Sequence, residues 1–173
     1  MYFICLAIPD PISSLIRSVQ SQIHTQFGVG KVLNSPPHIT LIPPYRSDEA
    51  DQWVEMIQEF THKATPVRQV RLIEIDSFGD RVIYISVEQH QALYDLSQEM
   101  RSVMKEWISV DLNRPLIPHV SLATRIPSQP MYRAILNTIE GKWKATDIDL
   151  TDLLILKHNG QQWDEYKRIT LHS

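Results

Sequence analysis

The sequence predicts an α+β protein built as two similar halves that share one cleft. Strand-like and helix-like segments alternate in the same order in both halves. A five-residue phrase also occurs once in each half, as Pro37-His38-Ile39-Thr40-Leu41 and as Pro118-His119-Val120-Ser121-Leu122. With ordinary residue frequencies, seven histidines give such a double match by chance roughly 0.2% of the time. The duplication therefore indicates both an architecture and a site.

Length and composition favour one soluble globular domain covering residues 1–173. The chain is 43% hydrophobic and 21% charged, which is ordinary for such a domain. A net charge of -3 argues against a broad basic surface for long duplex nucleic acid. The apolar run from Tyr2 to Ile8 is too short to span a membrane and lacks a basic start. Cys5 is the single cysteine. We expect a cytoplasmic protein, with no membrane association, that is a monomer.

The first half begins with a buried strand over Tyr2 to Ile8, followed by a turn at Pro9-Asp10-Pro11. Asp10 can cap a helix that has Pro11 at its first position. The helix carries an apolar stripe and ends at Gly28 and Gly30; the stripe is Ile12, Leu15, Ile16, Val19, Ile23 and Phe27.

A second helix is expected to start at Ser47, with Asp48 and Glu49 in its first turn and Ala50, Trp53, Val54 and Ile57 as its stripe. Strands follow at about 67–76 and 81–87, joined by a turn at Phe78-Gly79-Asp80.

The second half repeats this plan. A helix is indicated by three-and-four spacing of Leu93, Leu96, Met100, Val103, Met104 and Trp107. Asn113-Arg114-Pro115 predicts a loop before the second phrase, and another helix is expected at about 129–140, stopping at Gly141. Asn159-Gly160, between an apolar run at 153–156 and the segment 163–171, predicts a type I′ hairpin.

Each residue of the repeated phrase has a physical role on a strand. Residues two apart point to the same face, so His38 shares a face with Thr40 and His119 shares one with Ser121. The β-branched residue and the leucine point the other way and can anchor the strand in the core. The leading proline fits the first position of a strand, where no ladder N–H is needed.

Two such strands side by side would place two imidazoles and two hydroxyls around a tetrahedral anion such as phosphate. Near neutral pH, one histidine can accept a proton while the other donates one. The pair could then cleave or form a phosphodiester by in-line attack. Thr40 and Ser121 would donate hydrogen bonds to the non-bridging oxygens.

Other interpretations of the phrases remain open. A single histidine on a strand is most often structural and bonded to a backbone carbonyl. A catalytic zinc would need three protein ligands, and neither phrase offers a second ligand nearby, so we expect no metal. No phosphate-binding glycine loop or dinucleotide fingerprint occurs, so we expect no cofactor. The remaining histidines have no matching context and are interpreted as surface or structural residues: His24, His62, His90, His158 and His172.

The two phrases resemble the paired His-x-Thr/Ser signatures of the two-histidine (2H) phosphoesterases, in particular the 2′-5′ RNA ligase-like branch. The resemblance covers most of the chain. It implies a bilobal fold with pseudo-two-fold symmetry, in which two mostly antiparallel sheets face a central cleft and helices lie outside. It also implies metal-independent hydrolysis of 2′,3′-cyclic phosphates, or reversible 2′-5′ ligation, on an RNA end or a small nucleotide.

Carried over to this chain, the resemblance makes His38 and His119 the catalytic pair and Thr40 and Ser121 the phosphate-binding hydroxyls. For opening of a cyclic phosphate, it suggests His119 as the base that activates water and His38 as the acid on the leaving hydroxyl. The roles exchange in the reverse reaction.

The chain departs from the family pattern in two places. Some relatives carry a phosphate-binding arginine five residues after the second histidine, where this chain has Thr124 followed by Arg125. Arg125 can reach phosphate only if the strand bends or bulges; otherwise it is a solvated charge. The prolines of Ile42-Pro43-Pro44-Tyr45 should end the first motif strand early.

Three aromatic residues are open to two interpretations. Tyr45, Tyr84 and Trp163 could set specificity, with Tyr45 stacking on a base, or they could simply pack. The rival to an enzyme is a non-catalytic nucleotide or RNA-end binding module. The sequence does not decide between hydrolysis and ligation, and it does not name the substrate.

Overall fold

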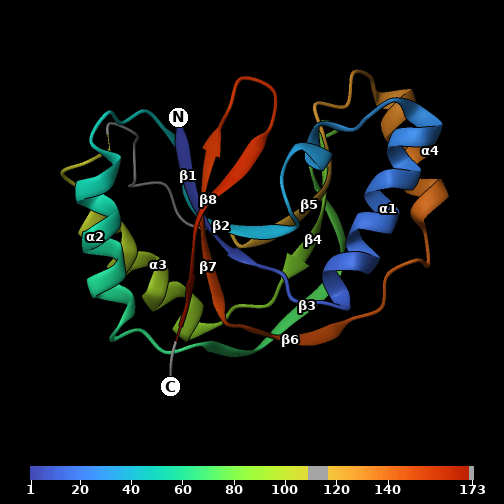
Figure 1. Cartoon of the computed structure of the whole chain (residues 1–173). Helices are drawn as coiled ribbons and strands as arrows, with labels where there is room; N and C mark the ends of the chain where they lie inside the picture. Colours follow the sequence, from blue (N-terminus) through green and yellow to red (C-terminus); the bar gives the residue numbers. More distant parts are fainter. Residues whose placement is uncertain (109–116, 172–173) are drawn as a thin grey trace.

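Two four-stranded antiparallel sheets flanked by four helices make up the computed structural model, which describes residues 1–108 and 117–171 (Figure 1). This confirms the predicted α+β class. The strands are β1 (Tyr2–Ala7), β2 (His38–Tyr45), β3 (Val67–Phe78), β4 (Val82–Val87), β5 (His119–Thr124), β6 (Thr146–Leu150), β7 (Asp152–His158) and β8 (Trp163–Thr170). The helices are α1 (Ile12–Phe27), α2 (Ala50–Thr61), α3 (Gln91–Met104) and α4 (Gln129–Ile139), with a short 3-10 helix, η1 (Lys31–Asn34).

The two sheets have matching strand orders, β2-β1-β7-β8 and β5-β4-β3-β6. Both strands that carry the repeated phrase are therefore edge strands, at the same position in their sheets. β2 and β5 also contact each other across the two sheets. The pseudo-two-fold arrangement of two lobes is confirmed, and it brings the two motif strands together.

Helices are exchanged between the lobes. α1 connects β1 to β2 of the first sheet, but it contacts β5 of the second sheet and α4. α3 connects β4 to β5 of the second sheet, but it contacts β2 of the first sheet and α2. Figure 1 shows the result, with α2 and α3 on one side of the molecule and α1 and α4 on the other. Each lobe therefore combines segments from both halves of the sequence.

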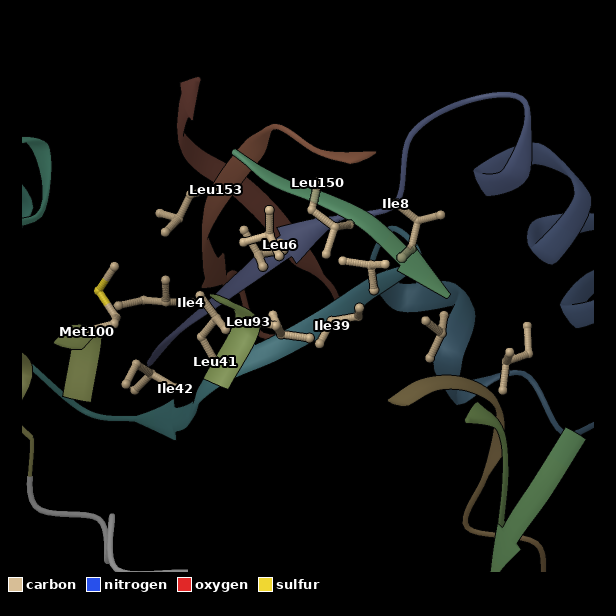
Figure 2. Packing of buried hydrophobic residues seen from close by; sticks show 14 of the residues in the cluster. Ile4, Leu6, Ile8, Ile39, Leu41, Ile42, Leu93, Met100, Leu150 and Leu153 are labelled. Atoms are coloured by element: carbon tan, nitrogen blue, oxygen red, sulfur yellow. The ribbon is translucent and has the colours of Figure 1, made fainter. Parts of the chain in front are cut away.

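One contiguous cluster of buried apolar side chains runs through both lobes. In the first lobe, Ile4 and Leu41 of the sheet lie near Leu93 and Met100 of α3 (Figure 2). The opposite face of this sheet is also apolar, because Phe3, Cys5, Leu154 and Leu156 form a smaller cluster with Trp163 beside it. The first sheet thus has helices on one face and a second, buried apolar cluster on the other.

Two helix starts differ slightly from the prediction. Pro11, and not Asp10, is the N-cap of α1, and no side chain caps the helix there; the Asp10 carboxylate instead accepts hydrogen bonds from Ser14 N–H at 3.0 Å and from the Ser14 hydroxyl at 2.6 Å. Ser47 does not begin α2, which starts at Ala50. The Ser47 hydroxyl instead accepts a hydrogen bond from Trp53 Nε1 at 3.1 Å and holds the approach to that helix.

The prediction that the prolines would end the first motif strand was wrong. β2 runs through Pro43 and Pro44 to Tyr45. The reason is its place at the edge of the sheet, where a residue without an N–H need not interrupt a ladder.

The hairpin at Asn159-Gly160 is present, but the predicted two-residue type I′ turn is not. His158 pairs with Trp163, so the loop has four residues. The Asn159 side-chain oxygen accepts hydrogen bonds from the backbone N–H groups of Gln161 and Gln162, both at 2.9 Å. These bonds make the wider loop favourable.

Some further differences complete the fold. β6 was not predicted, and β3 continues two residues beyond its expected end, to Phe78. The predicted loop at Asn113-Arg114-Pro115 lies outside the described residues. Within residues 1–108 and 117–171, no helix has the length and apolar character needed to cross a membrane.

Candidate active site at the paired motif strands

The two motif strands have the same register against their neighbours. In the first sheet, His38 pairs with Ala7 and Thr40 pairs with Cys5. In the second, His119 pairs with Ser86 and Ser121 pairs with Tyr84. In both strands the histidine and the hydroxyl residue are half-buried and the residues between and after them are buried, as the face pattern predicts.

A β-bulge follows the hydroxyl residue in each strand. Ile4 pairs with Ile42 while the adjacent Cys5 pairs with Thr40, so one extra residue, Leu41, is accommodated in β2. β5 does the same at Leu122, between Ser121 and Ala123. Because of the bulge, two consecutive residues point into the core of each lobe: Leu41 with Ile42, and Leu122 with Ala123. The repeat is therefore a repeated backbone geometry as well as a repeated sequence.

The two imidazoles are oriented by equivalent hydrogen bonds. Nδ1–H of His38 donates to the Pro36 carbonyl at 2.6 Å, and Nδ1–H of His119 donates to the Ile117 carbonyl at 2.8 Å. A carbonyl oxygen can only accept, so Nδ1 carries the proton in both rings. Nε2 is then the nitrogen available to accept or donate a proton in a reaction.

The surroundings of the two histidines differ. The ring of His38 lies 5.0 Å from that of Phe3. Burial lowers the pKa of His38 to about 4; the bond to Pro36 opposes this shift, and the charges of His119 and Arg17 add to it. His119 lies against two aromatic rings, Phe78 at 5.1 Å and Tyr84 at 5.2 Å. At neutral pH, His38 is thus held as a neutral proton acceptor.

A pocket of about 280 Å³ joins the two motifs. It is lined by His38 of β2 and by Ser121 of β5, so the histidine of one phrase and the hydroxyl of the other face the same space. The other lining residues are Gln20, Lys31, Val32, Ser35, Pro36, Pro37, Pro44, Thr124, Arg125 and Trp163. Thr40 and His119 do not line this pocket, although each shares a strand face with a residue that does.

Arg125 stands directly after β5 and lines the same pocket as His38 and Ser121. The bulge and a left-handed backbone at Arg125, with φ 57°, supply the bend that such a position requires. A non-glycine residue in this conformation is uncommon and often marks a functional position. The structure therefore places Arg125 at the pocket, and its role toward phosphate stays a prediction.

The sequence reasoning missed Gln20 of α1. Its side chain is 2% exposed and donates a hydrogen bond from Nε2 to the Ser121 carbonyl at 2.8 Å. Gln20 lies between Ile16 and Ile23 on the buried face, whereas Leu15, expected on that face, is 46% exposed. The sequence signal that could have identified Gln20 is its position as a polar residue at helical spacing within an apolar stripe. Gln20 ties α1 to the motif strand of the other lobe.

The three aromatic residues fall into different places. Tyr45 is buried with Tyr2 and Trp53 in the core, which rules out stacking on a bound base. Tyr84 packs beside His119, and its hydroxyl donates to Asp76 at 3.2 Å. Trp163 lines the pocket with His38.

Among residues 1–108 and 117–171, no group of three His, Cys, Asp or Glu side chains could hold a metal ion. His90 has the structural role expected of it, since its Nδ1 accepts a hydrogen bond from Leu93 N–H at the start of α3.

A family model described as the 2′-5′ RNA ligase superfamily matches residues 8–162 of this chain. A comparison with curated protein sequences found no match.

Solved structures match over nearly the whole chain. E. coli LigT complexed with 3′-AMP has a TM-score of 0.71 and 16% identity, covering 99% of this chain and 98% of that one. TT0787 of Thermus thermophilus has a TM-score of 0.68 and 16% identity, covering 98% and 97%. E. coli LigT complexed with NADP+ has a TM-score of 0.67 and 16% identity, covering 98% and 96%. At this identity, the likeness shows a shared fold.

Proposed function

Because the chain belongs to the 2′-5′ RNA ligase superfamily, we propose that it is a metal-independent phosphoesterase that uses His38 and His119 as an acid-base pair. Its substrate would be a 2′,3′-cyclic phosphate or a 2′-5′ phosphodiester, at an RNA end or in a small nucleotide. One observation carries this proposal: two histidines with the same register and the same Nδ1 hydrogen bond lie on adjacent edge strands. Binding alone would not require this duplicated orientation of two proton carriers.

The proposed roles of the two histidines reverse the expectation from the sequence. Desolvation lowers the pKa of His38 to about 4, so its ring is neutral near pH 7 and its Nε2 can accept a proton. In hydrolysis, its Nε2 takes a proton from water as the water oxygen bonds to phosphorus. The bond from phosphorus to one ribose oxygen breaks, and His119 donates a proton to that leaving oxygen.

Three other side chains are proposed to hold the phosphoryl group. Ser121 and Arg125 line the pocket with His38, and Thr40 shares the strand face of His38. Hydroxyl and guanidinium donors in this position would stabilise the negative charge that develops on the non-bridging oxygens. The nucleotides in the LigT structures, 3′-AMP and NADP+, support a nucleotide as the ligand.

The deciding experiment is a screen of 2′,3′-cyclic nucleotides and 2′-5′ oligonucleotides in the presence of EDTA. We expect turnover in the wild type, and chromatography of the products would show whether phosphate stays on O2′ or O3′. Tight binding without turnover of any substrate would favour the binding module instead. Loss of turnover in EDTA, restored by a divalent metal, would replace the proposal with a metal-dependent hydrolase.

A further inference from the structure

A second pocket adjoins the first on the far side of Arg125. It has a volume of about 460 Å³ and lies between the end of α1, η1 and the end of β5. Three residues line both pockets, namely Lys31, Thr124 and Arg125. The other lining residues are His24, Phe27, Gly28, Val29, Gly30, Asn34 and Pro127. A ligand in the first pocket can therefore extend directly into the second.

The lining of this second pocket is basic, although the chain as a whole has a net charge of -3. Lys31, Arg125 and His24 line it, and none of its lining residues is an aspartate or glutamate. Within the described part of the chain, neither Lys31 nor Arg125 forms an ion pair. These two cations are thus available to an anionic group from outside the protein.

The wall of the pocket is held in place from several sides. The backbone at Gly30 lies against the ring of His24, and a Cβ at this position would stand 2.3 Å from His24 Nδ1, so the His24 ring would have to move to admit a side chain. The Arg17 guanidinium donates to the Ser35 carbonyl at 2.6 Å, and Asn34 Nδ2 donates to the Gln161 carbonyl at 2.9 Å. Both bonds hold the C-terminal end of η1, the short helix that begins at Lys31. These contacts hold the backbone of this wall, which lowers the entropy lost on binding.

We propose that this second-phosphate pocket, formed around His24, Lys31 and Arg125, binds the phosphate on the 5′ side of the nucleoside whose cyclic phosphate reacts. The inference rests on the proposed function for its orientation. It narrows the substrate class to RNA ends, or to nucleotides that carry a 5′-phosphate as well as the cyclic phosphate. Arg125, whose backbone is strained at φ 57°, lies where the two pockets meet. In this proposal its guanidinium binds both phosphates.

The test compares substrates that differ by one phosphate: adenosine 2′,3′-cyclic phosphate, the same nucleotide with a 5′-phosphate, and the dinucleotide ApA 2′,3′-cyclic phosphate. We expect kcat/KM to be roughly tenfold higher for the two substrates that carry the second phosphate. This is the gain expected from one additional hydrogen bond to a charged group. In Lys31→Gln the ratio of kcat/KM with the second phosphate to kcat/KM without it should fall toward one. Lys31→Arg should restore this ratio. Lys63→Gln, an exposed lysine beyond the end of α2, is the matched control.

A preference for the dinucleotide alone would identify the internucleotide phosphate as the group bound and would retain the proposal. Equal kcat/KM for all three substrates, or a ratio unchanged in Lys31→Gln, would overturn it.

A binding measurement separates failure of this pocket from failure of the proposed function. Calorimetry with two nucleotides that differ by one phosphate, adenosine 3′-phosphate and adenosine 3′,5′-bisphosphate, needs no turnover. A roughly tenfold tighter Kd for the bisphosphate that is lost in Lys31→Gln would support the pocket even if no substrate turned over. Equal Kd values would contradict it, even if cyclic phosphates were hydrolysed.

Discussion

The two motif strands are the same in backbone and different in environment. His38 and His119 share their register, their following bulge and a hydrogen bond to the carbonyl two residues before them. His38, however, lies beside Phe3 and has its pKa lowered by desolvation, whereas His119 lies against Tyr84 and the 36% exposed Phe78.

This comparison separates two tasks. The repeated phrase sets which ring nitrogen carries the proton and which face the ring occupies, and it does so equally in both lobes. The residues outside the phrase set how readily each ring is protonated. A symmetric motif can thus give one acid and one base, because its surroundings are not symmetric.

Removing either histidine should have the largest effect. We expect His38→Ala and His119→Ala each to lower kcat by roughly 10² to 10⁴-fold, since each removes one proton transfer. The double variant should lose less than the product of the single losses, because the two groups act in one step. Steady-state kinetics would measure this, with His62→Ala as a control. Full activity in either single variant would contradict the proposed roles.

The environment of His38 should appear in the pH dependence of stability. The unfolded histidine titrates near 6.5 and the folded one at about 4, so the unfolded chain binds more protons between these values. The contribution of His38 to stability is complete above about pH 6.5 and falls by up to about 3 kcal/mol as the pH drops to 4. Denaturant unfolding of the wild type and of His38→Asn would give the difference. If the free energy of unfolding depended on pH in the same way in both proteins, the pKa of His38 would not be lowered in the folded state.

The hydroxyls should matter less than the histidines. Removing a donor to a charged phosphoryl oxygen costs about 1.5 to 3 kcal/mol, so Thr40→Val and Ser121→Ala should lower kcat/KM by roughly 10 to 100-fold. Thr40→Ser keeps the donor and should retain most of the activity. Similar losses of kcat/KM in Thr40→Val and Ser121→Ala would support one phosphoryl group bound by both lobes. A loss in Ser121→Ala alone would show that only the second lobe binds it.

The smallest expected effect is a shift in the pH profile. Phe3→Ala would let water reach His38 and raise its pKa from about 4 toward its ordinary value, moving the acid limb of kcat/KM to higher pH. Phe78→Ala, the matched change beside His119, should leave the acid limb in place. If Phe78→Ala moved that limb and Phe3→Ala did not, the assignment of base and acid would have to be exchanged.

The sequence predicted the features that depend on local periodicity. The strand face shared by His38 and Thr40 followed from two-residue alternation, and so did the matching face of β5. The fold class followed from the order of these segments together with the family resemblance.

Features that depend on distant neighbours could not be predicted in the same way. The prolines of β2 are tolerated because the strand lies at a sheet edge, and edge position is a property of the whole sheet. The contact from Gln20 to Ser121 joins residues 101 positions apart. The low pKa of His38 arises from burial that its own phrase does not encode.

The exchange of α1 and α3 means that the two copies of the phrase cannot be separated into independent modules. A chain cut at the turn between β3 and β4 gives a first fragment that holds β1 and β2 but lacks β7, β8 and α3. The second fragment holds β4 and β5 but lacks β3 and α1. Each fragment therefore carries one or more strands that complete the other fragment's sheet and a helix that packs on the other fragment's motif strand. The two fragments should therefore fold only when mixed, and acid and base arise together or not at all.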